Sequence, residues 1–232
     1  MIKGTKASVI SNVLEKIPNE ELLKVKEASL DMSPSMDWII RENFLNAKKV
    51  TDRFHAQKLV TEALQDMRVE LRWKAIEEET KNKSQVMIYA NGDTKRQLLA
   101  RSRYLLFKTE NKWTDSQKER AEILFQEYPK LKTGYHLSLM FRSIYEHSKT
   151  REEAKEKLDQ WYEKVKEKDL KTFVLVSKSI KTYEGTILNF FPERSTNALA
   201  ECFNSKIKSF RSLVRGVSDK KFFLFRLAKI YA

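Results

Sequence analysis

Residues 24–52, KVKEASLDMSPSMDWIIRENFLNAKKVTD, are the stretch that decides the fold class. Within this stretch, residues 24–30 and residues 48–51 are short segments with strand character. An aspartate follows each segment, Asp31 after the first and Asp52 after the second. A helix is predicted between the two segments, so we expect parallel strands joined by a right-handed crossover.

The predicted crossover helix has a clear start. Ser33 suits the N-cap and Pro34 suits the first helical position, where the missing amide hydrogen is not needed. Its expected buried residues are Ile39, Ile40 and Phe44. A further helix is expected over residues 8–17. In such helix and strand arrangements, ligand groups gather beyond the carboxyl ends of the strands, where Asp31 and Asp52 fall.

Most of the chain after residue 53 shows apolar residues at spacings of three and four, which predicts helices. The clearest are a long helix from Phe54, a basic helix over 94–108, a helix capped by Thr114 or Asp115, a helix over 131–146, and one opened by the capping box Thr150 to Glu153. The tryptophans at 73, 113 and 161 are expected in the core. The predicted fold class is therefore mostly α with a small β part.

Composition narrows the functional classes. The 232 residues are 41% hydrophobic and 33% charged, without an apolar run long enough to span a membrane. The N-terminus lacks the pattern of a signal peptide, so a cytoplasmic location is expected. Cys202 is the single cysteine, which excludes an internal disulfide, and no cluster of Cys and His offers the ligands of a structural zinc site.

The net charge of +13 favours nucleic acid as a partner. The last 42 residues hold nine basic residues against three acidic ones, so the charge is concentrated there. A helix capped by Ser195 or Thr196 and ending before Gly216 is predicted in this segment. One face of it is apolar: Leu199, Phe203, Ile207, Phe210 and Val214. The opposite face is polar and basic: Asn197, Glu201, Asn204, Ser205, Lys208, Arg211 and Arg215.

Glu201 is the single carboxylate on that polar face. In one interpretation, Glu201 does no more than offset the repulsion among Lys208, Arg211 and Arg215 on a solvated surface. Alternatively, it can be the ligand of a hard metal ion beside a row of residues that follows a phosphate backbone. The spacing of the residues is compatible with both interpretations.

Three blocks of sequence resemble the DDE transposases of bacterial insertion sequences, in the ISL-three group. The blocks are VKEASLDM (25–32), NAKKVTDRFH (46–55) and STNALAECFNSKIK (195–208), followed by Arg211, Gly216 and FFLFRL (222–227). Their order and spacing also match, so the resemblance covers nearly the whole chain.

The resemblance implies an incomplete ribonuclease H-like fold that carries a large all-helical insertion. Core residues 1–66 would be followed by the insertion at 67–190 and by C-terminal helices at 191–232. Three carboxylates of this family bind two divalent ions, Mg²⁺ or Mn²⁺, and Asp31 matches the second carboxylate and Glu201 the third. The residues implied to contact DNA are Asn204, Lys208, Arg211 and Arg215.

The sequence departs from the family pattern before Asp31. The 30 preceding residues leave no room for the strands that would carry the first aspartate. We therefore expect a transposase fragment that is inactive by itself, associated with the bacterial nucleoid. The open strand edge would favour self-association or pairing with an upstream transposase fragment. The alternative is a non-catalytic protein that binds DNA or joins a transposase assembly, or a relic of a transposase.

Several other residues have two interpretations. Asp52 and His55 could join the metal site, but a capping role for Asp52 and local packing of His55 are favoured. Trp161 could stack on an extruded base instead of filling the core. A second basic segment, made of Lys95, Arg96, Arg101, Arg103 and Lys108, could contact phosphates or only face solvent.

Overall fold

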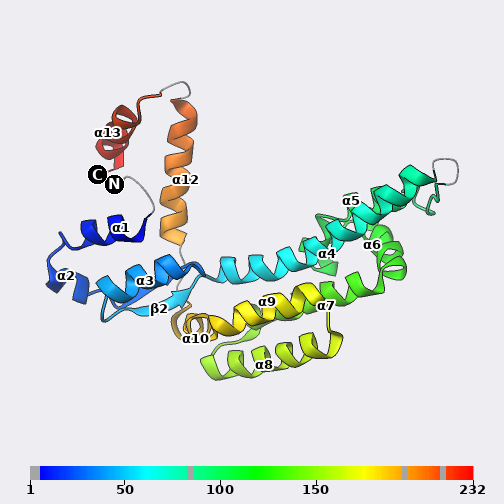
Figure 1. Ribbon diagram of the computed structural model, residues 1–232, viewed down its shortest axis with the longest axis horizontal. Helices are drawn as coiled ribbons and strands as arrows, with labels where there is room; N and C mark the ends of the chain where they lie inside the picture. The colour runs from blue at the N-terminus through cyan, green and yellow to red at the C-terminus, as the bar shows by residue number, and fades with distance from the viewer. Residues whose placement is uncertain (1–5, 83–85, 195–197, 215–217, 232) are drawn as a thin grey trace. The chain divides into compact units, whose positions relative to one another are not determined.

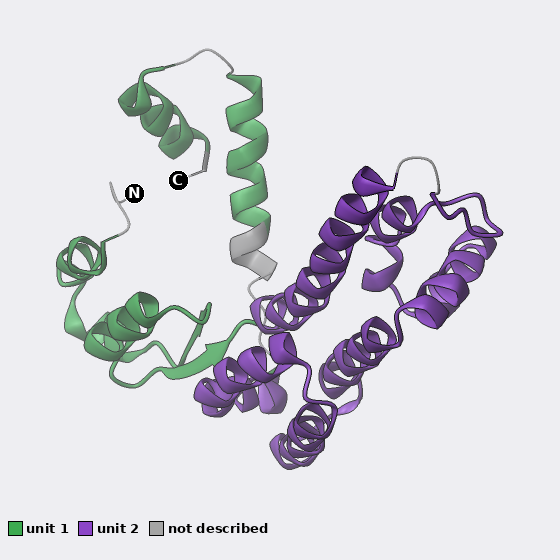
Figure 2. Cartoon of the chain, turned by 45° about the vertical axis from the view of Figure 1, so that its right-hand side comes forward, with its two compact units in different colours: residues 1–52, 194–232 green, residues 53–193 purple. Residues whose placement is uncertain are grey.

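A computed structural model describes residues 6–82, 86–194, 198–214 and 218–231, without the side chains of residues 198–201 and 231 (Figure 1). The chain divides into two compact units (Figure 2). The first unit joins residues 1–52 to residues 194–232, and the second holds residues 53–193. No helix within the described ranges is long and apolar enough to cross a membrane.

The first unit contains a two-stranded parallel sheet, as the sequence predicts. Strand β1 (Glu27–Leu30) pairs with β2 (Lys48–Thr51), and helix α3 (Pro34–Asn43) connects them. The register places Glu27 opposite Lys48 and Leu30 opposite Thr51. Proline at the first position of α3 and the extended backbone of Ser33 before it agree with the predicted helix start.

Two further helices precede the sheet, α1 (Ala7–Leu14) and α2 (Asn19–Leu23). The side-chain amide of Asn43 links α3 to α1, because its Nδ2 donates to Ser11 Oγ at 2.7 Å and to the Ile39 carbonyl at 2.9 Å. Of the three residues expected to be buried on α3, Ile39 is buried, whereas Ile40 and Phe44 are half-buried.

The C-terminal part of the first unit forms α12 (Ala198–Leu213) and α13 (Lys220–Tyr231). The rings of Phe210 and Phe223 stack with centroids 5.5 Å apart and hold the two helices together. The guanidinium of Arg226 lies 5.8 Å from the Phe210 ring. The expected caps of α12, at Ser195 or Thr196 and at Gly216, lie outside the described residues.

The described residues of the second unit form helices and 3₁₀ turns, apart from connecting loops and one isolated antiparallel bridge between Ile88 and Thr94. Its long helices are α4 (Arg53–Lys81), α6 (Asp115–Glu127), α7 (Pro129–His147), α8 (Arg151–Lys168) and α9 (Lys171–Thr182). The shorter elements are α5 (Lys95–Arg101), α10 (Glu184–Leu188), α11 (Phe190–Glu193) and the 3₁₀ turns η1 (Leu105–Phe107) and η2 (Glu110–Lys112). Helix α4 packs against α5, α7 and α9, and α8 packs against α7 and α9.

Side-chain caps define several helix starts in this unit. Thr94 and Thr114 each form a complete capping box with the glutamine three residues later. At Thr150 only half of the predicted box forms: its hydroxyl accepts from the Glu153 amide at 3.2 Å, whereas the Glu153 carboxylate accepts from the Lys149 amide at 2.8 Å. The predicted helix starts at 114 and 150 are thus confirmed.

Gly134 and Trp161 show how closely the core of the second unit is packed. A Cβ at Gly134 in α7 would lie 3.1 Å from both Met67 Sδ and Phe173 Cε2, so glycine lets α4 and α9 approach closely. Trp161 is fully buried, and its Nε1 donates to the Leu137 carbonyl at 3.0 Å. Its ring cannot stack on a DNA base, so that interpretation of Trp161 is wrong and its core role is confirmed.

Two predictions about the second unit are corrected. Trp73 was expected in the core, but it lies on the outer side of α4 with 62% of its surface exposed. The basic helix expected over 94–108 ends at Arg101. Beyond it, side chains from later in the sequence donate to backbone carbonyls: Trp113 to Leu105, Arg142 to Phe107 and Tyr135 to Lys108, at 2.8 to 2.9 Å.

Candidate metal and nucleic-acid site

The carboxyl ends of β1 and β2 bring two aspartates to one edge of the sheet. Asp31 follows β1 directly and Asp52 follows β2. The Asp52 amide donates to the Leu30 carbonyl at 2.9 Å, which extends the parallel ladder to the point where both side chains begin. The local geometry therefore follows from the strand register.

Asp31 has an open acceptor position. Its Oδ1 is buried and has no hydrogen-bond donor among the residues that the structure describes. Burial of an acceptor without a donor costs on the order of 1–3 kcal/mol. A water molecule or a cation that binds this oxygen would offset that cost, and carboxylate oxygen is the ligand type that Mg²⁺ prefers. The residue present at this position therefore fits a divalent metal ligand.

Asp52 and His55 have local surroundings. Asp52 is buried and stands immediately before Arg53, the first residue of α4. The His55 ring meets the Phe54 ring edge-on, with centroids 5.7 Å apart. This local packing of His55 agrees with the favoured interpretation, in which neither Asp52 nor His55 is a metal ligand.

Helix α12 carries the other proposed ligand and the proposed DNA contacts. The side chains of Asn204, Lys208 and Arg211 are exposed on it. Neither cation forms an ion pair with a carboxylate in the described part of the chain. The backbone of Glu201 lies in α12, but its side chain is outside the described residues, as is the whole of Arg215.

The opposite face of α12 is apolar, as predicted, but only part of it is covered. Phe210 is buried against α13, Ile207 and Val214 are half-buried and Phe203 is exposed. Within the described residues, no group of three His, Cys, Asp or Glu side chains lies close enough to hold a metal ion. The pairing of Asp31 with Glu201 therefore stays a prediction.

The second basic segment divides into paired and unpaired cations. Lys95 lies 3.5 Å from Glu78 and Arg96 lies 3.5 Å from Glu79. Arg101 binds the buried carboxylate of Asp93, to which Arg120 also donates at 2.9 Å. Burial favours the neutral form of Asp93, but the hydrogen bonds from Arg120 and Arg101 outweigh it and lower the Asp93 pKa. These cations are paired with carboxylates of the helical unit.

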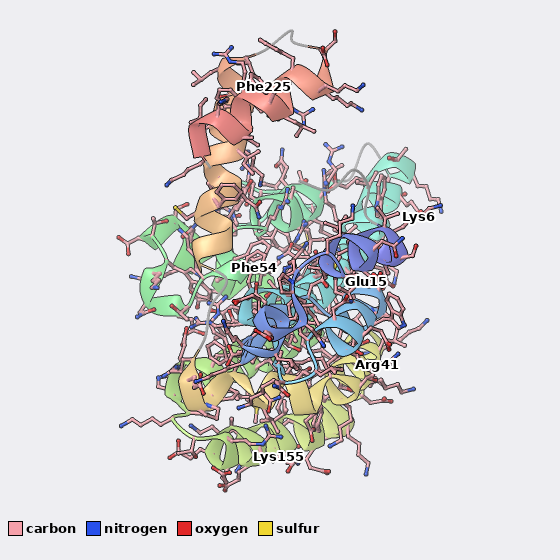
Figure 3. The ribbon with its side chains drawn as sticks, turned by 90° about the vertical axis from the view of Figure 1, so that its left-hand side faces the viewer. Lys6, Glu15, Arg41, Phe54, Lys155 and Phe225 are labelled. Atoms are coloured by element: carbon pink, nitrogen blue, oxygen red, sulfur yellow. The ribbon has the colours of Figure 1, made fainter. Side chains whose placement is uncertain are left out.

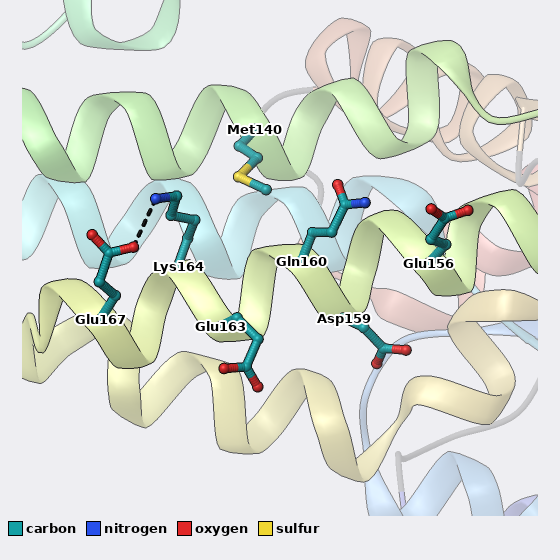
Figure 4. A pocket seen from close by; sticks show the side chains of 7 residues that line it. All are labelled: Met140, Glu156, Asp159, Gln160, Glu163, Lys164 and Glu167. Carbon is teal, nitrogen blue, oxygen red and sulfur yellow. Dashed lines mark hydrogen bonds and ion pairs between the residues drawn. The ribbon is translucent and has the colours of Figure 1, made fainter.

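Sequence reasoning did not foresee an acidic groove on α8 (Figure 4). It has a volume of about 580 Å³, and the carboxylates of Glu156, Asp159, Glu163 and Glu167 line it with Met140, Gln160 and Lys164. Lys164 Nζ lies 2.7 Å from Glu167 Oε2. Hydrogen bonds from Lys164 and Lys168 lower the Glu167 pKa to about 2. The excess of negative charge makes this groove unsuited to a phosphate backbone.

Comparison with known proteins gives one match. The model of a family described as a transposase, within the ISL-three group of DDE transposases, matches residues 1–227. Searches of curated proteins and of solved structures gave no match. The family match spans nearly the whole chain and includes both the aspartates at the strand ends and helix α12.

Proposed function

We propose that this chain, which belongs to the ISL-three group of DDE transposases, acts in the DNA strand cleavage and transfer that move an insertion sequence. The observation that supports this proposal most directly concerns Asp31. Its buried Oδ1 lacks a donor among the described residues and stands where a parallel sheet gathers ligand groups. An oxygen of this kind is suited to a divalent metal ion, the cofactor that this family generally uses.

In the proposed site, Asp31 is the second carboxylate of the family and Glu201 is the third. Mg²⁺ or Mn²⁺ bound there would activate a water or a DNA 3′-hydroxyl and stabilise the leaving oxygen. The exposed side chains of Asn204, Lys208 and Arg211 on α12 would hold the phosphate backbone, and Arg215 is proposed to join them. Lys208 and Arg211 have no carboxylate partner among the described residues, which supports this role.

We further propose a ribonuclease H-like core made of residues 1–66 and 191–232, with an all-helical insertion at 67–190. The parallel β1 and β2 pair supports this assignment, as does the single compact unit formed by residues 1–52 and 194–232. These 232 residues supply two of the three carboxylates, so we expect the chain alone to bind metal and DNA without cutting DNA.

Metal titration and a cleavage assay test the proposal. The wild-type chain should be stabilised by Mg²⁺ or Mn²⁺ against thermal unfolding, and Asp31→Asn and Glu201→Gln should each reduce that stabilisation. Glu156→Gln, which removes a carboxylate on α8, is the matched control and should respond as the wild type does. Absence of any metal effect would contradict the site. Cleavage of end-bearing DNA by the chain alone, abolished by Glu201→Gln, would contradict the expected inactivity.

A further inference from the structure

An arginine-lined groove of about 660 Å³ lies along α4 in the second unit, away from the acidic groove of α8. Arg68 and Arg72 belong to α4, Arg103 follows α5, and Arg142 belongs to α7. Three segments that are distant in the sequence thus place four guanidinium groups around one depression. We call this surface the α4 groove.

The charge of the α4 groove is not neutralised by the protein. None of its four arginines forms an ion pair with a carboxylate in the described ranges, whereas Arg96, Arg101 and Arg120 in the same unit all do. The two other charged residues that line the groove are Lys58 and Glu62, whose charged atoms lie 3.6 Å apart and offset one another. The groove therefore carries a net excess of four positive charges.

Arg68 lies at the bottom of the groove and is held rigidly. It is only 6% exposed, and it donates from Nε to Gln65 Oε1 at 2.7 Å and from Nη1 to the Leu99 carbonyl at 2.9 Å. Burial, followed by the nearby charges of Arg72 and Arg103, lowers the Arg68 pKa. A buried cation beside two like charges is destabilising, and an anion in the groove would compensate for it.

The groove also offers neutral groups of the kind that contact nucleic acid. Gln57 lines it, and the Nε2 of this residue is buried without an acceptor among the described residues. Phe54, labelled in Figure 3, is 58% exposed, and Phe107 is exposed at the same groove. An amide donor can bind a phosphate oxygen, and aromatic rings can cover deoxyribose or stack on bases.

We propose that the α4 groove binds the phosphate backbone of DNA, as a contact separate from the basic row of α12. Arg72, Arg103 and Arg142 would contact phosphate oxygens, and Arg68 would supply charge from below. The inference deepens the proposed function, because it takes DNA as the partner, but it does not depend on the metal site. Guanidinium groups suit it because they bind phosphate oxygens in pairs.

The test is the salt dependence of DNA binding by the full chain, measured by fluorescence anisotropy with a labelled duplex. Arg72→Gln and Arg103→Gln are the informative variants, because both side chains are exposed and neither forms a hydrogen bond or ion pair in the described structure. Lys166→Gln, an exposed cation on α8 outside the groove, removes the same charge and is the matched control. Binding is measured in EDTA, so the outcome is independent of metal at Asp31 and Glu201.

Each lost phosphate contact should reduce the slope of log K against log salt by about 0.9 and weaken binding by about 8-fold at 0.1 M salt. We expect this result for Arg72→Gln and Arg103→Gln, with Lys166→Gln unchanged and with wild-type melting temperatures throughout. An unchanged slope in both groove variants would overturn the proposal, as would an equal effect of Lys166→Gln. In either case, an intact metal response would leave the proposed function standing.

Discussion

Replacement of Asp31 by asparagine should raise the stability of the metal-free chain and lower its stability, relative to wild type, when metal is present. In the wild type, Oδ1 is buried without a donor among the described residues. The cost of such an acceptor is on the order of 1–3 kcal/mol. The residue is only half-buried, so about 1 kcal/mol is the appropriate estimate. Asparagine still places an oxygen acceptor there and removes only the charge, so part of this cost is relieved and the rise in Tm should be at most about 2–4 °C for a chain of this size.

When metal is present, the wild type should be more stable than the Asp31→Asn variant. At a free Mg²⁺ concentration ten times its Kd, the wild type would gain about 1.4 kcal/mol, whereas the variant would gain almost nothing. Urea unfolding followed by circular dichroism, in EDTA and in Mg²⁺, measures both differences. Asp66→Asn, at an exposed position of α4, is the control and should change neither. A variant that is less stable in EDTA, or that gains as much from Mg²⁺ as the wild type, would refute the reasoning.

Three other substitutions test the helical unit. Asp93→Asn removes the buried carboxylate that binds Arg101 and Arg120 and should cost about 1–3 kcal/mol at neutral pH. The Asp93 pKa is lowered in the folded chain, so the stabilisation from this carboxylate is present above its usual pKa of about 4 and is lost as the pH falls through the folded value. The stabilities of the wild type and of Asp93→Asn should therefore converge in acid, which unfolding curves measured across the pH range would check. Trp161→Ala should cost about 3–5 kcal/mol and leave the salt dependence of DNA binding unchanged, which anisotropy would check. Gly134→Ala should lower the Tm, because an overpacking cost of about 1–3 kcal/mol exceeds the gain of about 1 kcal/mol in helix propensity.

Sequence reasoning succeeded where a few adjacent residues determine the local structure. Pro34 marks the start of α3 at the predicted place, although the Ser33 side chain makes no cap hydrogen bond, and the same helix, with a strand on each side, requires a parallel pair. Thr114 defines the start of α6 through its own hydrogen bonds. In each case, the residues that decide the outcome are within a few positions of one another.

Prediction from the sequence failed where contacts with distant segments determine which side chains are buried and where a helix ends. Periodicity on α4 is compatible with several buried faces, and the neighbouring helices cover the side of Ala56, Val60 and Leu64, so Trp73 is left exposed. The helix expected to continue to residue 108 ends at Arg101, and beyond it Arg142 and Tyr135 of α7 donate to the carbonyls of Phe107 and Lys108. Neither contact could be recognised before the fold was known.

The distribution of ion pairs changes what the net charge of this chain means. Charge density along the sequence predicts DNA contacts equally at Arg101 and Arg103, which are two positions apart, yet Arg101 is bound to Asp93 and Arg103 faces the α4 groove without a carboxylate partner among the described residues. An arginine that is already paired gains little from a phosphate, because it must first give up its carboxylate. We propose DNA contacts at Arg103 in the α4 groove and at Lys208 and Arg211 on α12, which have no carboxylate partner among the described residues, and each can be tested by itself.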